Sequence, residues 1–257
     1  MTFRQKFTAF RTILVKEILR YARIWIQTVL PPMITTALYF IIFGNLIGSQ
    51  IGDMQGFRYM EFIVPGLIMM AVITNAYANV VSSFYGSKFQ RHIEEMLVAP
   101  VPNYVILTGF IAGGVARGLT VGVAVTLVSL LFTPLSIHNL WVMLSMILLT
   151  AILFSLAGFI NGIYARSFDD IAIVPTFVLT PLTYLGGIFY SINMLPPFWQ
   201  HVSLANPILY MINAFRFGFL GVSDISLAAS YGISVGFIVL LYALSIRLLR
   251  KGHGIRT

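Results

Sequence analysis

Residues Lys88–Asn103 read KFQRHIEEMLVAPVPN, a short charged segment between two long apolar runs. Phe89, Ile93 and Leu97 recur every four residues, so a helix would carry them on one face. Pro100 lacks a backbone donor and disfavours helical angles in the residue before it, so the helix is expected to end there. At 1.5 Å per residue, a helix from Lys88 to Ala99 would be roughly 18 Å long, which is too short and too polar to cross a bilayer. The pattern alone fits either a helix lying along the membrane or a solvated connector.

The composition places the chain in a membrane. Its 257 residues are 58% hydrophobic and 9% charged, and the mean hydropathy is +0.90. Soluble domains usually carry about 25% charged residues, so most of this surface must face lipid. The net charge of +8 does not indicate a nucleic-acid binder, because the basic residues lie at the ends of apolar runs rather than in one patch. The absence of cysteine excludes disulfides and thiol chemistry.

Residues 1–23 have the pattern of an interfacial amphipathic helix. An apolar stripe with basic residues on the other side favours a position in the headgroup plane. The segment does not fit a cleavable signal, because the apolar run after it is too long and lacks a small-residue cleavage site. The stripe consists of Phe3, Phe7, Phe10, Leu14, Ile18 and Tyr21, and the basic residues opposite are Lys16, Arg20 and Arg23.

Six apolar runs are each long enough to cross a bilayer core of about 30 Å. The chain is therefore predicted to be a single all-α membrane domain over residues 1–257, with a six-span bundle from 24 to 249 and a tail from 250 to 257. The predicted spans are Ile24–Ile47, Phe62–Tyr85, Val105–Phe132, Trp141–Ile163, Ile171–Tyr190 and Leu227–Leu249.

The basic residues are distributed unevenly between the two sides of this bundle. Thirteen lie in the N-terminal segment, the loops around Arg91 and Arg166, and the C-terminal tail, whereas Arg58 and Arg216 lie on the opposite side. Cytoplasmic loops are rich in Lys and Arg. Both termini and the segment around Arg91 are therefore predicted to be cytoplasmic.

Three polar side chains within the predicted spans are candidates for a translocation path. Asn75 and Asn79 lie four residues apart on one face of the second span, and Arg117 lies near the centre of the third. A charge at that depth costs about 2.5–3.5 kcal/mol on insertion scales, so something must compensate it. Glycines around Arg117 permit close approach by a helix or a ligand. Arg117 is thus either paired at a helix contact or available to an anionic group.

The stretch Ser191–Ser223 is too apolar for an ordinary exterior loop, and prolines break it into short pieces. We predict one or two short helices that dip back into the outer leaflet, with aromatic residues at the interface. The marked residues of this re-entrant outer segment are Pro196, Pro197, Asn206, Pro207, Tyr210 and Arg216.

No motif for catalysis or nucleotide binding is present in the sequence. The chain lacks G-x-x-x-x-G-K-[ST], so it shows no P-loop of its own. No acidic residue falls deep inside a predicted span, the four histidines have no metal-ligand spacing, and no nucleophile is paired with a base. We therefore predict no catalytic residue, metal site or cofactor in this chain, and no enzymatic activity of its own.

Two stretches resemble signatures of the type-2 ABC-transporter permeases, a family of drug, polysaccharide and lipid exporters. IEEMLVAPV, residues 93–101, resembles the family's acidic coupling helix, although Arg91-His92 stand where the family often has Gly-Thr. Residues Pro181–Arg216 resemble the family's fifth span and re-entrant outer segment. The matching positions there are Pro181, Gly187, Pro196, Asn206, Pro207, Tyr210 and Arg216.

The resemblance covers the whole chain and implies the permease subunit of an ABC exporter in the bacterial inner membrane, moving a drug-like, lipid or glycan-type substrate outward. It further implies a permease homodimer with two separate ATPase subunits, which would hold ATP and Mg. The Lys88–Ala99 segment would then be a cytoplasmic coupling helix, assisted by the loop Tyr164–Asp170. The candidates for the ATPase interface are Phe89, Arg91, Ile93, Glu94, Glu95, Leu97, Arg166, Asp169 and Asp170.

Two other functions fit a multi-span chain without a nucleotide site. One is a secondary transporter that runs on an ion gradient, and the other is a membrane scaffold that transports nothing. Transport that depends on a co-expressed ATPase and resists an uncoupler would exclude the first. A neighbouring reading frame that encodes a Walker-motif ATPase would count against the second.

Overall fold

The structure, a computed structural model, describes residues 1–252, without the side chains at positions 45–47, 49 and 97. Within that range five helices are long and apolar enough to cross a membrane. The all-α membrane class and five of the predicted spans are thereby confirmed, whereas residues 253–257 of the predicted tail lie outside the described range. The five helices are Trp25–Gly44, α5 (Tyr59–Phe89), α7 (Asn103–Ser129), α8 (Leu140–Tyr164) and α13 (Leu227–Lys251).

The predicted fifth span, Ile171–Tyr190, is shorter in the structure. Helix is present only over Asp170–Tyr184, as α9 (Asp170–Val174), the π-helical turn η2 (Pro175–Leu179) and α10 (Thr180–Tyr184). At 1.5 Å per residue this stretch measures about 22 Å, less than the roughly 30 Å hydrocarbon core. Pro175 begins the π-helical turn and Pro181 lies in α10, and each of them removes a backbone donor from the helix. Helix length therefore does not confirm a sixth span.

The N-terminal part contains several short elements. The helix α1 (Phe3–Arg23) begins with a capping box between Thr2 and Gln5. Two prolines at the start of α3 cannot continue the preceding hydrogen-bond ladder, so the first span is divided. Its pieces are α2 (Trp25–Thr28), α3 (Leu30–Tyr39), the π-helical η1 (Phe40–Ile47) and α4 (Gly48–Ile51), followed by the antiparallel pair β1 (Asp53–Met54) and β2 (Phe57–Arg58).

The remaining elements are short helices between the long ones. One of them, α6 (His92–Val98), joins α5 to α7. The other three follow α10 and precede α13: the 3₁₀ turn η3 (Ile192–Met194), α11 (Pro197–Leu204) and α12 (Pro207–Leu220).

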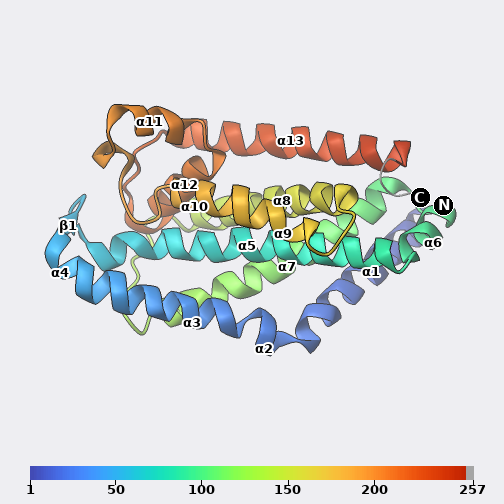
Figure 1. The fold of residues 1–257 in the computed structure, drawn as a ribbon, viewed down its shortest axis with the longest axis horizontal. Helices are drawn as coiled ribbons and strands as arrows, with labels where there is room; N and C mark the ends of the chain where they lie inside the picture. The colour runs from blue at the N-terminus through green and yellow to red at the C-terminus, as the bar shows by residue number, and fades with distance from the viewer. Residues whose placement is uncertain (253–257) are drawn as a thin grey trace.

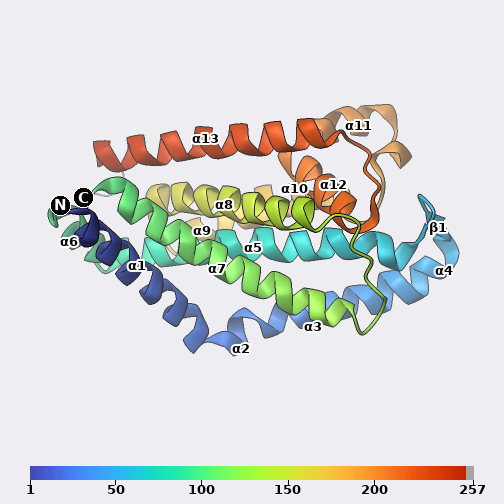
Figure 2. The same ribbon diagram turned by 180° about the vertical axis from the view of Figure 1, so that it is seen from behind.

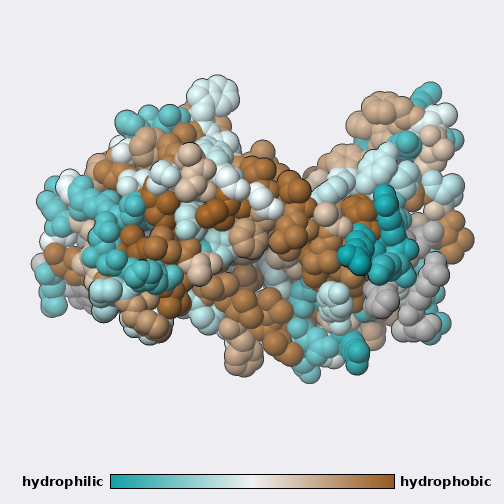
Figure 3. Space-filling model, turned by 90° about the horizontal axis from the view of Figure 1, so that it is seen from above, coloured by the Kyte–Doolittle hydropathy of each residue, from teal (hydrophilic) through white to brown (hydrophobic). Residues whose placement is uncertain are grey.

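The long helices lie side by side along the long axis of the molecule (Figures 1 and 2). Both termini and α6 lie at one end, and α4, β1 and α11 lie at the opposite end. Figure 3 shows hydrophobic residues over the middle of one face and hydrophilic residues gathered towards its two ends. This distribution is the one expected for a bundle whose middle faces lipid and whose ends face water.

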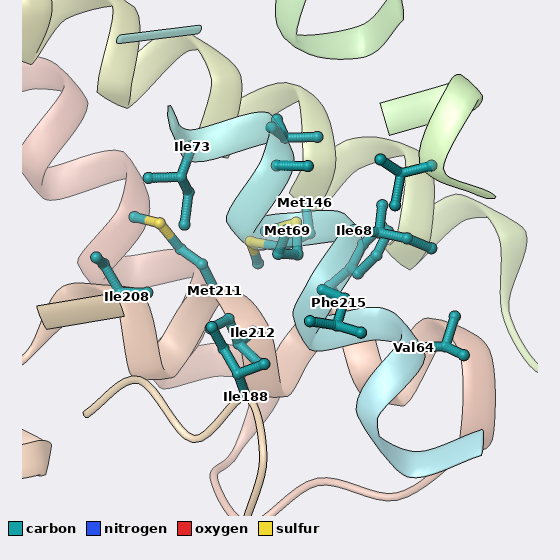
Figure 4. Packing of buried hydrophobic residues seen from close by; sticks show 14 of the residues in the cluster. Val64, Ile68, Met69, Ile73, Met146, Ile188, Ile208, Met211, Ile212 and Phe215 are labelled. Atoms are coloured by element: carbon teal, nitrogen blue, oxygen red, sulfur yellow. The ribbon is translucent and has the colours of Figure 1, made fainter. Parts of the chain in front are cut away.

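The helix α5 lies at the centre of the bundle. Most of its residues are buried, and it packs against α7, α8 and α12. Figure 4 shows α5 side chains, among them Ile68 and Met69, next to Met146 of α8 and Phe215 of α12. The close packing depends on small residues, because a Cβ atom at Gly158 of α8 would lie 2.5 Å from the carbonyl oxygen of α5 residue Tyr77.

The helix α1 lies against the glycine face of α7. A Cβ atom at Gly109 would lie 2.6 Å from the side chain of Ile13, and one at Gly113 would lie 2.4 Å from the Cβ atom of Glu17. The predicted helix over residues 3–23 is confirmed, but its two faces differ from the predicted ones. The buried residues of α1 are Ile13, Glu17 and Tyr21, of which only Tyr21 belongs to the predicted apolar stripe, and Arg20 of the predicted basic face turns towards α5.

Candidate functional sites

The segment predicted as one helix over Lys88–Ala99 is divided in the structure. The helix α5 continues through Phe89, a turn follows, and α6 begins at His92. Arg91 in that turn adopts the left-handed conformation, with φ 62°, which no helix can include. The predicted end of the helix is confirmed, because Ala99 is extended ahead of the proline.

The residues of α6 do not share one face with Phe89. Ile93 is fully buried in an apolar cluster with Phe84, Phe110 and other residues of α5, α7 and α8. Glu94 and Glu95, in contrast, are exposed, as is Arg91. The side chain of Leu97 lies outside the described part of the chain. The helix is thus anchored by an isoleucine and presents two carboxylates to solvent.

Three aromatic rings join the end of α5 to the loop between α8 and α9. The ring of Phe168 lies 4.9 Å from that of Tyr85 and 5.3 Å from that of Phe89, centroid to centroid, with edge-to-face geometry in both pairs. Such pairs stabilise by about 0.5–1.5 kcal/mol beyond their burial. Phe89 is nevertheless 65% exposed and Phe168 is 56% exposed. These three residues form what we call the aromatic cluster, and two of its rings face outward.

Hydrogen bonds fix the same loop to α5. The Lys88 ammonium donates to the carbonyl oxygens of Ile163 and Ala165, both at 2.8 Å, and so satisfies the free carbonyls at the end of α8. The Tyr85 hydroxyl donates to the Arg166 carbonyl at 2.9 Å. The structure therefore brings together two segments that the sequence predicts as one contact surface.

Asp170 stabilises this loop internally. Its carboxylate accepts from the backbone N–H groups of Arg166 at 2.8 Å and Ser167 at 3.1 Å, and its own N–H donates to the Ser167 hydroxyl. The Arg166 N–H group, followed by the Ser167 side chain, holds the pKa of Asp170 below its usual value. Arg166 and Asp169 have exposed side chains, so they remain available to a partner while Asp170 closes the loop.

A polar cluster lies among α1, α5 and α7. Arg117 of α7 donates to the side-chain oxygen of Asn75 at 3.1 Å, and Asn75 in turn donates to the Ala71 carbonyl at 3.0 Å. One turn further along α5, Arg20 of α1 donates to both the backbone and the side-chain oxygen of Asn79 at 2.8 Å. Two arginines from different helices thus meet two asparagines on one face of α5.

Glu17 completes this cluster, and no pattern in the sequence marks it directly. Its carboxylate is fully buried, accepts from the Ser83 hydroxyl at 2.5 Å and pairs with Arg20 at 3.2 Å. A buried carboxylate needs such partners, since its desolvation is costly when it is unpaired. The signal in the sequence that points to this contact is Gly113, because Glu17 packs where a side chain at that position of α7 would lie. The space that glycines leave beside Arg117 is therefore occupied in part by α1.

A pocket of about 320 Å³ lies beside Asn75, between α3 and α5. Its lining includes Pro31, Pro32 and Thr35 of α3 and Thr74 of α5. Asn75 therefore contacts both the polar cluster and an open cavity.

Residues of the predicted re-entrant segment begin short helices and form hydrogen bonds that hold them in position. Asn206 caps α12 by accepting from the Ile208 N–H at 3.0 Å, and its amide donates to the Leu182 carbonyl at 2.6 Å. Tyr210 donates to the Leu204 carbonyl at 2.8 Å. Pro196 and Pro197 begin α11, and Pro207 is the first residue of α12.

Arg216 lies inside the bundle rather than at its surface. It is 1% exposed, its guanidinium lies 3.9 Å from the centre of the Phe62 ring, and it donates to the Gly187 carbonyl. A desolvated arginine over an aromatic face contributes roughly 2 kcal/mol. The short helices at this end are therefore joined to α5 through this residue.

The fold and these sites define a multi-span α-helical membrane protein with a polar cluster inside and an exposed aromatic and acidic surface at the end that carries the termini. Within the described residues, no group of histidine and acidic side chains is arranged to hold a metal ion. The family model for ABC-2 type transporters matches residues 8–220. The chain belongs to this family.

Individual relatives agree with that assignment. The inner membrane transport permease YadH of Escherichia coli strain K12 is 62% identical over 250 residues, which cover 97% of each chain. Nodulation protein J of Rhizobium leguminosarum bv. viciae is 23% identical over 237 residues, 92% of each chain. The resemblance to type-2 permeases seen in the sequence is thereby confirmed.

Proposed function

We propose that this chain is the membrane-spanning subunit of an ATP-driven exporter, and that a separate ATPase binds the end that carries α6 and the aromatic cluster. Permeases of this family generally work with an ATPase subunit. The observation that carries the proposal is the pairing of Phe89 with Phe168, which leaves two large rings exposed where α5 ends, one turn before α6 with its exposed Glu94 and Glu95. Exposed aromatic rings bordered by charges are typical of protein interfaces.

The arrangement of the helices supports six crossings. The N-terminus and the C-terminal end of α13 lie at the same end of the bundle (Figure 1), which favours an even number of crossings. The five long helices supply an odd number. The sixth crossing is then made by Asp170–Tyr184 together with the chain that follows it, since this stretch leads from the loop at Phe168 towards α11 at the far end. The short helices α11 and α12 would form the re-entrant outer segment.

The uneven distribution of charge in the sequence supports one orientation of the chain in the membrane. Thirteen of the 16 Lys and Arg residues belong to the N-terminal segment, the loops around Arg91 and Arg166, and the C-terminal tail, which supports a cytoplasmic position for the end that carries α6. An ATPase that uses cytoplasmic ATP would meet α6 and the aromatic cluster there. A reporter that is active only outside the cytoplasm, fused after Thr257, should stay silent. Reporter activity would contradict both the orientation and the ATPase site.

We further propose that two copies of the permease bind two ATPase subunits and move a drug-like, lipid or glycan-type substrate outward between them. Asn75, Asn79 and Arg117 are the polar residues that we assign to the path. The assignment to the path is best supported for Asn75, because this residue links the polar cluster to the pocket between α3 and α5. ATP and Mg would bind in the partner chain.

The test is transport by the full-length permease co-reconstituted with its ATPase. We expect transport to require ATP hydrolysis and to be unaffected by an uncoupler that collapses ion gradients. Transport that persists without the ATPase and stops with the uncoupler would instead establish a secondary transporter. Absence of any transport, with normal assembly of the complex, would favour a scaffold.

A further inference from the structure

Two adjoining pockets run along α7 on the side that faces α1 and α13. The larger has a volume of about 600 Å³ and is lined almost entirely by apolar side chains of α1, α7, α8 and α13. On α7 it extends from Thr108 to Leu119, roughly 16 Å at 1.5 Å per residue. Tyr242 of α13 belongs to both pockets and joins them. We call the two together the α7 groove.

The second pocket, of about 510 Å³, forms a polar mouth to the groove. It lies where α7 begins and α13 ends, and its lining includes Asn103, Tyr104 and Arg250. The Lys6 ammonium of α1 lies 5.9 Å from the centre of the Tyr104 ring, so a second cation borders the mouth. The residues that line the two pockets include no Asp or Glu. The start of α7 and the end of α13, which line this mouth, lie at the end of the bundle that carries both termini (Figure 2).

The two parts of the α7 groove match the two parts of a phospholipid. The apolar part lies along helices that are long and apolar enough to cross a membrane, and the cationic mouth lies where α7 begins and α13 ends. Each Lys or Arg near the membrane surface contributes about 1 kcal/mol to binding anionic lipid. A zwitterionic lipid would gain little from the two cations.

We propose that the α7 groove binds one anionic phospholipid from the leaflet on the side of the termini. Its acyl chain lies along α7 from Thr108 to Leu119, and its phosphate lies at Lys6 and Arg250. This inference depends on the membrane location of the chain and not on the transport that we propose.

The test compares lipid retention by the full-length permease in native mass spectrometry, with dioleoylphosphatidylglycerol and dioleoylphosphatidylcholine as probes. The double variant Lys6→Gln/Arg250→Gln should bind the anionic lipid about 25-fold more weakly, because each lost cation accounts for roughly a fivefold change. The matched control is Arg11→Gln/Arg247→Gln, which removes the same charge from exposed residues of the same two helices. The control should retain the preference for the anionic lipid. Equal loss in both double variants would overturn the site.

A second variant tests the apolar part without changing the charge. Ala112 is a half-buried residue of the groove wall, so Ala112→Phe fills the space that the acyl chain needs. We expect this variant to lose bound phosphatidylglycerol while both cations remain. Soluble glycerol 3-phosphate should not displace the lipid, and displacement at similar concentration would show an anion site instead. If Ala112→Phe lowers the fraction of permease dimer and leaves lipid retention unchanged, the groove is a protein interface and the proposal is wrong.

Discussion

The guanidinium of Arg117 and the side-chain oxygen of Asn75 lie 3.1 Å apart, and this hydrogen bond joins α7 to α5 inside the bundle. It compensates part of the cost of a charge at that depth. It does not use the whole guanidinium, because the Nε atom of Arg117 has no hydrogen-bond partner among the described residues. Arg117 therefore combines a helix contact with remaining donor capacity.

Substitution of Arg117 separates these two roles. Arg117→Lys keeps the charge and loses the planar fork, whereas Arg117→Gln keeps donors and loses the charge. If Arg117 attracts an anionic group, Gln should reduce transport by about tenfold or more relative to Lys, since hydrogen bonds to charged groups contribute about 1.5–3 kcal/mol. ATP hydrolysis without substrate should survive in both variants. Normal transport by the Gln variant would assign Arg117 to helix packing alone.

The contact between Gly113 and Glu17 gives a stability prediction. A Cβ atom at Gly113 would lie 2.4 Å from that of Glu17, so Gly113→Ala must push α1 away from α7. We expect a loss of about 1–3 kcal/mol, typical of overpacking, measured as a lower unfolding temperature in detergent. Gly232→Ala in α13 is the control, because nothing lies within 4 Å of the added atom. Equal unfolding temperatures for the two variants would show that α1 is not seated on α7.

These contacts mark what the sequence predicts and what it does not. The apolar runs predict the long helices, because span length follows from bilayer thickness. The partner of each helix is not encoded in the same local way: glycines on α7 indicate a close neighbour, but not that Glu17 fills the place beside Gly113. The position of Arg20 could not be predicted for the same reason. An amphipathic pattern predicts that basic side chains face solvent, and the sequence does not show that Asn79 supplies a buried acceptor. Arg91 adopts the left-handed conformation without being Gly or Asn, so the break before α6 had no sequence signal.

Asp170 gives a pH dependence with a defined sign. Its pKa is lowered in the folded protein, chiefly by the Arg166 N–H group, so its stabilising effect is present above the unfolded pKa of about 3.9. That effect is lost as the pH falls through the lowered folded value. The difference in unfolding temperature between wild type and Asp170→Asn should therefore be constant from pH 7 to about 4 and shrink below that.

The neighbouring Asp169→Asn is the control for this experiment. The Asp169 side chain is exposed and accepts no hydrogen bond from the described residues, so its substitution should leave the unfolding temperature unchanged over the same range. A difference for Asp170→Asn that grows on acidification would contradict the role of the carboxylate in closing the loop.

The acidic pair on α6 tests the proposed ATPase contact. Glu94 and Glu95 are exposed, and each exposed ion pair contributes only about 0–1 kcal/mol, so Glu94→Gln/Glu95→Gln should have a mild effect. The reversal Glu94→Lys/Glu95→Lys should do more, because it would place like charges together at an interface. We expect at least a tenfold loss of permease-stimulated ATP hydrolysis, with normal membrane insertion, because α6 stays anchored by buried Ile93.

A charge reversal at the other end of the molecule supplies the matched control for this pair. Asp53 is exposed in β1, at the end opposite to α6 (Figure 1), so Asp53→Lys should leave stimulated hydrolysis unchanged. The three results are expected in the order Lys pair, Gln pair, Asp53→Lys, from most to least impaired. A Lys pair that couples as well as Asp53→Lys would exclude α6 from the contact. The ATPase would then have to meet the permease through Phe89 and Phe168 without the acidic pair, and their replacement by alanine would become the deciding measurement.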